Sequence, residues 1–219
     1  AGSKAAGTTA TALLAAEALA GDAGAAANPV VQLAAATLFL HEAQYAAALR
    51  LLRTSPSSLE HLALTVQVQL RLDRPDLAEA TVATMKGLDD ESALTSISSG
   101  LVNLSRGGDR IKEASLVYKE LLDRFGRSRA GLNGLATAYM VMKRFDDAER
   151  SLNDALEGDA DDPDTLANVV TLHMQAGKTG RSYTDALARL RTAAPAHPYV
   201  VALGRAEDMF DRVAATHGV

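Results

Sequence analysis

Hydrophobic and polar residues alternate along most of the chain with the period of an amphipathic α-helix. From Val30 to about Thr216, apolar side chains recur at positions i, i+3, i+4 and i+7, and short polar segments interrupt the pattern. No run of residues alternates for long with the period of two that a half-buried strand requires. The pattern therefore predicts an all-α protein built from several helices that are joined by short loops.

The predicted helices form a repeat that is marked by small residues. Five alanines each follow a turn and an aromatic residue, a proline or an isoleucine, and they are separated by 30 to 38 residues: Ala48, Ala78, Ala114, Ala148 and Ala186. A tetratricopeptide repeat is a helix–turn–helix unit of about 34 residues. Because one hairpin cannot bury its own apolar surface, each must stack on the next. We therefore expect a tetratricopeptide-like α-α superhelix, a right-handed solenoid of helical hairpins.

The clearest repeat unit covers Ala130–Asp162. One face of its first helix carries apolar residues at helical spacing: Leu132, Leu135, Ala136 and Tyr139. Lys143-Arg144 is the predicted turn, and the inner face of the second helix carries Phe145, Ala148, Leu152 and Ala155. Small residues where the two helices meet allow a close approach, and the larger residues fill the flanking space.

The pattern divides the chain into three segments. Residues 1–28 are predicted to be a tag remnant and an Ala-rich N-terminal segment, with two helical turns at Thr11–Leu19. Residues 29–198 are predicted to form about five hairpins, the last one shifted by an insertion at Thr179-Gly180. Residues 199–219 are predicted to be a C-terminal capping helix. The abrupt start predicts a fragment of a longer protein.

Composition narrows the classes of function. The net charge is −5 and the pI is about 5.5, so there is no basic surface for a nucleic-acid backbone or an anionic membrane. The absence of cysteine excludes disulfides, thiolate catalysis and cysteine-based zinc sites. Thr11–Ala20 is too short to span a bilayer and contains Glu17. We expect no nucleic-acid partner and no direct membrane insertion.

Candidate chemical motifs are incomplete. The aspartates around Pro163 lack the glycine and the bidentate glutamate of a calcium loop, because Asp164 and Val170 stand at those positions. His41-Glu42 begins a zinc-protease motif, but Tyr45 stands where the second histidine is required. No nucleophile–base pair is recognisable. We therefore expect no catalytic residue, no metal site, no cofactor and no enzymatic activity.

The first helix of each hairpin is expected to line the concave side of the superhelix. Large flexible residues recur there at one position of the repeat, and small or polar residues precede them by one turn. The predicted partner-binding groove contains Leu40, Leu70, Asn103, Arg106, Thr137, Met140, Thr171 and Met174. The alternative is that tight curvature buries these residues against neighbouring repeats.

Several stretches of the chain resemble one known family. They are Val31–Leu52, Leu64–Leu77, Gly107–Phe125, Leu132–Ala136, Phe145–Leu156 and Asp162–Asn168, with His197-Pro198 and Phe210-Asp211-Arg212 near the end. In this order they are similar to the epsilon subunit of coatomer, over about Val30–Val213. Lys4–Asn28 matches poorly. Members of the family are longer at the amino end, so the resemblance implies that the first repeats are missing here.

The resemblance implies a structural subunit of the COPI vesicle coat. Such a subunit binds and stabilises the C-terminal region of the coatomer alpha subunit, and it serves intra-Golgi and Golgi-to-ER retrograde transport. It implies a cytoplasmic protein that is peripheral on Golgi membranes and COPI-coated vesicles. The alternative is a transient adaptor or cochaperone that binds a peptide segment of a partner. A clamp for an acidic peptide needs several basic and amide side chains, and only Asn103, Arg106 and Asn133 are available.

Overall fold

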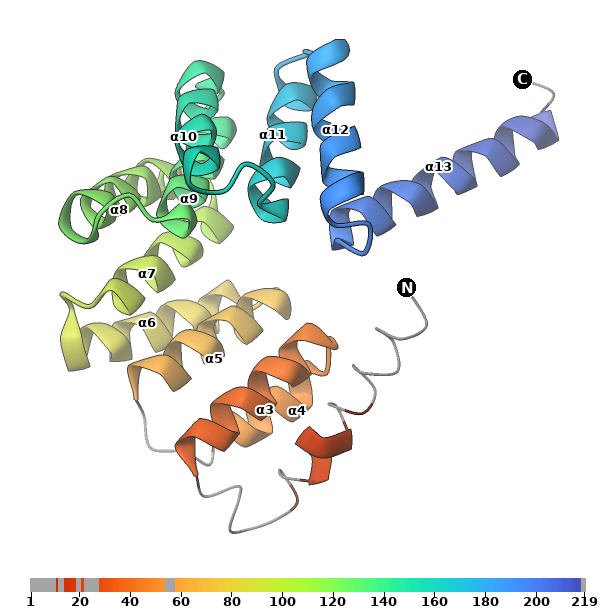
Figure 1. Cartoon of the computed structure of the whole chain (residues 1–219). Helices are drawn as coiled ribbons and strands as arrows, with labels where there is room; N and C mark the ends of the chain where they lie inside the picture. Colours follow the sequence, from red (N-terminus) through yellow and green to blue (C-terminus); the bar gives the residue numbers. More distant parts are fainter. Residues whose placement is uncertain (1–10, 12–13, 19–20, 22–27, 54–57, 218–219) are drawn as a thin grey trace. The chain divides into compact units, whose positions relative to one another are not determined.

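The computed structural model is all-α in the part of the chain that it describes, which is residues 11, 14–18, 21, 28–53 and 58–217. Figure 1 shows the helices in chain order. They are α3 (Pro29–His41), α4 (Tyr45–Leu52), α5 (Leu59–Arg71), α6 (Pro75–Asp89), α7 (Ala93–Arg106), α8 (Arg110–Phe125), α9 (Arg129–Val141), α10 (Phe145–Gly158), α11 (Pro163–Gln175), α12 (Arg181–Ala193) and α13 (Pro198–His217). Of the predicted turns at Thr11–Leu19, residues 14–18 are helical, and part of that segment lies outside the described residues.

Side-chain caps explain where several first helices of hairpins begin. The Oδ1 of Asn28 accepts a hydrogen bond from the backbone N–H of Val30 at 3.0 Å, and Asp162 caps α11 in the same way through Thr165 at 3.0 Å. Each of these caps satisfies a backbone donor that the first turn of a helix leaves without a partner. A proline follows both caps, which suits the first position of a helix because that position needs no N–H.

The hairpin turns share one backbone conformation. A residue with positive φ stands near the start of the turn at Ala43 (56°), Asp73 (55°), Lys143 (59°) and Gly177 (71°). The following N–H then reaches back to a carbonyl of the first helix, as from Arg144 to Tyr139 at 2.9 Å. This left-handed helix end reverses the chain within a few residues. Three of the four positions hold residues for which positive φ is strained.

The chain folds into two compact units, Ala1–Arg110 and Ile111–Val219. In the first unit, α3 packs on α4, α5 packs on α6, and α5 also contacts α3, α4 and α7. Ala48 and Ala78 are fully buried where the helices of these hairpins meet. The prediction that small residues mark the close approach of paired helices is therefore confirmed at both positions.

In the second unit, α9 packs on α10, α11 packs on α12, and α11 also contacts α9 and α10. Ala114 and Ala148 are fully buried, and Ala186 is 7% exposed. A Cβ added at Gly134 of α9 would lie 2.5 Å from Cε1 of Tyr118 on α8, so the ring of Tyr118 packs directly on this glycine. The third predicted hairpin combines α7 and α8, which the division into units separates.

Acidic residues of α10 and of the turn that follows it pair with basic residues from elements before and after them. Asp154 pairs with Arg127, and Asp159 and Asp162 pair with Arg129 at 3.0 and 2.8 Å. From the other side, Lys178 lies 2.7 Å from Glu149, and Arg189 lies 3.4 Å from Asp161. The aspartates around Pro163 therefore form structural ion pairs.

The helix α13 has two different parts. Tyr199, Val200 and Leu203 pack on the apolar cluster of α11 and α12. Further along, Met209 and Phe210 are 60% and 72% exposed, and the structure shows no buried residue in α13. The outer part of this predicted capping helix therefore carries apolar surface as well as charge. The proposed segment boundaries at residues 28 and 198 stay a prediction.

Candidate partner-binding surface

The eight residues of the predicted groove lie on the first helices of hairpins and form two sets, one in each unit. In the first unit, Leu40 lies at the end of α3, Leu70 on α5, and Asn103 and Arg106 on α7. In the second unit, Thr137 and Met140 lie on α9, and Thr171 and Met174 lie on α11. The two sets differ in how much of each side chain is accessible.

In the first unit, the two leucines are only partly available. Leu40 and Leu70 are half-buried and pack against the apolar clusters of their own hairpins. Asn103 is 7% exposed, so it supports the packing of α7 rather than offering a polar contact. The hairpins themselves cover much of each leucine side chain, and binding of a partner by these residues stays a prediction.

Arg106 takes part in an ion pair within the first unit. Its Nη2 lies 2.6 Å from Oε2 of Glu79 on α6, and Arg110 lies 3.2 Å from Oε1 of the same carboxylate. The hydrogen bond from Arg106 holds the pKa of Glu79 below its ordinary value. Binding of a peptide carboxylate by Arg106 would require exchange of this partly exposed ion pair.

In the second unit, Met140 is buried and Met174 is exposed. Met140 is 4% exposed, so its role on a contact surface needs correction: α9 turns this side chain into the packed interior. Met174 is 51% exposed. Thr137 and Thr171 are half-buried, and their hydroxyls donate to the carbonyls of Asn133 and Ala167 at 2.8 Å. These bonds fix both threonine side chains against their own helices.

The structure brings Thr171 and Met174 together with Tyr199 of α13. The hydroxyl of Tyr199 lies 3.5 Å from Sδ of Met174, and Thr171 is one turn before Met174 on α11. Burial raises the pKa of Tyr199. The sequence pattern assigned Tyr199 only to the start of the last helix, because nothing in it indicates which hairpin that helix contacts. The combined surface is apolar with one phenol and one hydroxyl.

A row of amide side chains joins α9 to α11 and was not predicted. Nδ2 of Asn133 donates to Oγ1 of Thr165, and Nδ2 of Asn168 donates to Oδ1 of Asn133, both at 2.8 Å. The two asparagines are 35 residues apart, about one repeat length. That spacing is the signal by which the pair could have been found. Both lie half-buried one turn before Thr137 and Thr171.

Neither a metal site nor a membrane span is found in the described part of the chain. Across residues 28–53 and 58–217, no three His, Cys, Asp or Glu side chains gather in a way that suits a metal ion. Among the helices that the structure describes, none has the length and apolar character needed to cross a bilayer.

Comparison with known proteins places this architecture in a family. The model of the coatomer epsilon subunit family matches residues 6–217. The chain belongs to this family. A coatomer subunit epsilon-2 from Oryza sativa subsp. indica is 38% identical over 185 residues, which cover 84% of this chain and 61% of that protein. A coatomer subunit epsilon-1 from Arabidopsis thaliana is 35% identical over 185 residues, which cover 84% of this chain and 62% of that protein.

The chain spans about three fifths of the length of these curated relatives. Among solved structures, a tetratricopeptide repeat protein from Parabacteroides merdae aligns with a TM-score of 0.77 at 14% identity, over 91% of this chain and 78% of that one. The likeness confirms the predicted fold class, an all-α tetratricopeptide-like array of helical hairpins. At this identity it shows the fold alone.

Proposed function

We propose that this chain acts as a non-enzymatic structural subunit of the COPI coat, where it binds and stabilises the C-terminal region of the coatomer alpha subunit. The observation that carries the proposal is the family match over residues 6–217. On this proposal the chain works in the cytoplasm, peripheral on Golgi membranes and COPI-coated vesicles. It serves intra-Golgi and Golgi-to-ER retrograde transport.

The accessible apolar positions support contact with a protein partner. In the second unit, Met174 and Val141 are 51% and 55% exposed at the ends of α11 and α9. Tyr199 and Thr171 lie beside Met174 and add polar groups to its surroundings. Exposed apolar side chains with a few polar neighbours are typical of the buried centre of a stable protein–protein interface. Met174 is therefore the residue that we expect to contribute most in this unit.

The proposal is tested by co-purification with the C-terminal region of the alpha subunit from the same organism. Met174→Asp places a charge in the proposed interface and is expected to weaken retention at least tenfold. Met209→Asp is the matched control, because Met209 is 60% exposed on α13 and lies outside the predicted groove. Equal loss of binding in both variants, or in neither, would remove the support for this surface.

The alternative function, a transient adaptor for a peptide segment, predicts a different response to salt. An apolar and permanent interface survives a wash in molar salt, whereas a clamp made of exposed charges releases its ligand. Arg106 pairs with Glu79 within the chain, so it has to exchange this partner before it binds a peptide carboxylate. Release of the alpha subunit by salt alone would favour the adaptor.

A further inference from the structure

The turn between α7 and α8 lacks a hydrogen bond that closes the other hairpin turns. In the four turns with a shared conformation, an N–H after the positive-φ residue reaches a carbonyl of the first helix at 2.8 or 2.9 Å. In the described part of the chain, neither Gly108 nor Asp109 returns its N–H to a carbonyl of α7. The backbone bonds of this turn run from Gly107 to Asn103 at 3.3 Å and from Arg110 to Gly107 at 3.2 Å. The chain reversal at this point is therefore held less firmly than at the other turns.

Two consecutive glycines with positive φ occupy this turn. Gly107 has φ 72° and ψ −163°, a combination that is essentially confined to glycine, and Gly108 has φ 57°. A Cβ added at either position would meet no atom within 4 Å, so close packing does not explain the two glycines. Glycine has the widest backbone freedom of all residues. The turn therefore contains two adjustable residues in series.

This turn coincides with the division of the chain into two compact units. The first unit ends at Arg110, two residues after Gly108, and the second unit begins at Ile111. Hinges between rigid bodies are a few residues in loops or at the ends of helices that absorb large changes in φ and ψ. Gly107 and Gly108 have both the position and the backbone freedom that a hinge requires.

One carboxylate holds the chain on both sides of the glycines. Glu79 of α6 lies 2.6 Å from Arg106, which precedes the glycines, and 3.2 Å from Arg110, which follows them. The three side chains are 39–48% exposed, and ion pairs at such positions are weak, so the contact opens readily. We refer to Glu79, Arg106 and Arg110 together as the latch.

We propose that Gly107 and Gly108 form a hinge between the two units and that the latch restrains it. While Glu79 holds both arginines, α7 and the start of α8 keep one arrangement. When the latch opens, the glycines rotate and the units turn relative to one another. The predicted groove residues form one set in each unit, so this rotation changes the separation of the two sets. The inference does not depend on which partner binds the chain.

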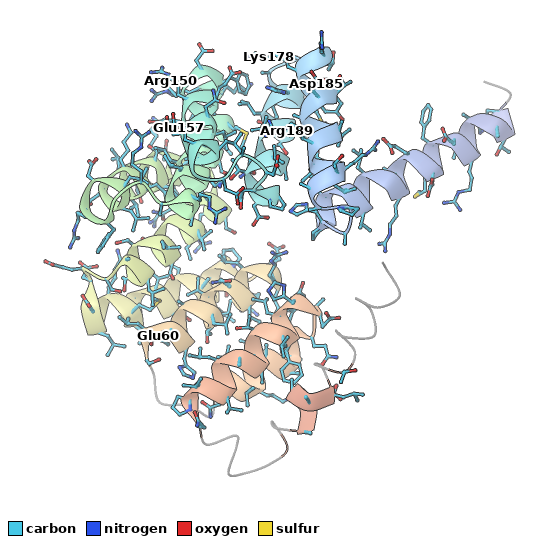
Figure 2. All side chains as sticks on the ribbon, viewed as in Figure 1. Glu60, Arg150, Glu157, Lys178, Asp185 and Arg189 are labelled. Atoms are coloured by element: carbon cyan, nitrogen blue, oxygen red, sulfur yellow. The ribbon has the colours of Figure 1, made fainter. Side chains whose placement is uncertain are left out.

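The test measures the distance between the units with pairs of nitroxide labels, by double electron–electron resonance. The chain has no cysteine, so labels attach only where cysteine is introduced. Figure 2 shows Glu60 on α5 and Glu157 on α10. Both residues are exposed, and their replacement by cysteine gives one label site in each unit. A second pair, Lys112→Cys with Glu157→Cys, lies within the second unit and reports the motion inside that unit.

Glu79→Gln removes the charge of the latch and is expected to widen the distribution of distances between the units about twofold. The matched control is Glu149→Gln, because Glu149 follows Glu79 by 70 residues, about two repeat lengths. Glu149 also pairs with a basic residue at the next hairpin turn, Lys178, at 2.7 Å. In that turn the N–H of Lys178 reaches the carbonyl of His173 at 2.8 Å, so no widening is expected from the control.

A second set of variants tests the glycines directly in the Glu79→Gln background. Gly108→Asn is expected to narrow the distribution again, because asparagine tolerates positive φ but has fewer conformations than glycine. Gly177→Asn, at φ 71° in the α11–α12 turn, is expected to leave the distribution unchanged. Equal widths in Glu79→Gln and Glu149→Gln, equal effects of the two asparagine variants, or widening of the pair within the second unit each overturns the proposal.

Discussion

The substitution Gly134→Ala is expected to destabilise the second unit. A Cβ at this position would lie 2.5 Å from Cε1 of Tyr118, whereas carbon atoms in contact prefer about 3.5–4.0 Å. The ring must therefore move by about 1 Å, and Tyr118 is only 2% exposed, so its surroundings resist the movement. Overpacking of this kind costs about 1–3 kcal/mol. Replacing glycine inside a helix returns about 1 kcal/mol.

The net expectation for Gly134→Ala is a loss of up to about 2 kcal/mol in the free energy of unfolding, measured by urea denaturation, instead of the gain of about 1 kcal/mol that an unhindered helix position would show. Gly204→Ala is the matched control: Gly204 lies inside α13 with nothing within 4 Å of the added Cβ, so no destabilisation is expected. In a double-mutant cycle, Tyr118→Leu removes the ring and is expected to relieve the clash, with a favourable coupling to Gly134→Ala. If Gly134→Ala raises the free energy of unfolding by about 1 kcal/mol, as expected for an unhindered helix position, the contact of the Tyr118 ring with Gly134 is wrong.

Three further predictions concern the turn backbone and two ionisable groups. Lys143→Gly removes the strain of positive φ at 59° and is expected to raise the free energy of unfolding by about 1 kcal/mol. A lower free energy of unfolding in the variant, measured by urea denaturation, would refute the argument. Burial raises the pKa of Tyr118, so the phenol ionises at a lower pH in the unfolded chain than in the folded one. The free energy of unfolding is therefore expected to fall as the pH rises above about 10. Urea midpoints should show this fall to be less steep in Tyr118→Phe. The hydrogen bond from Arg106 lowers the pKa of Glu79 in the folded chain. The stability that this carboxylate contributes is therefore present above its unfolded pKa of 4.5 and is lost as the pH falls through the lower folded pKa. Over that pH range, the difference in urea midpoint between the original chain and Glu79→Gln should shrink.

The repeat and its close contacts were predictable because small residues report local packing. Ala48, Ala78, Ala114 and Ala148 follow their turns at similar positions, and each one is fully buried. Helical period and repeat length both follow from residues near one another in the sequence. The sequence therefore predicted the hairpins and the residues at which their helices meet.

The exposure of the candidate surface was less predictable, because it depends on small rotations of each helix. Met140 and Met174 are 34 residues apart and occupy the same predicted position, but Met140 is 4% exposed and Met174 is 51% exposed. The contact of Tyr199 with Met174 depends on how the last helix folds back, which its own sequence does not encode. Long-range ion pairs such as Glu79 with Arg106 likewise depend on which hairpins become neighbours.

The ion pairs of α10 and its following turn have a consequence for the order of the repeats. Arg127 and Arg129 come from before this helix, and Lys178 and Arg189 come from after it, so its acids are neutralised from both directions along the chain. A copy of this hairpin moved elsewhere in the array would carry a surplus of negative charge without those counterparts. The repeats are therefore alike in shape but not interchangeable, and shuffling, duplicating or deleting one of them would disturb its neighbours as much as itself.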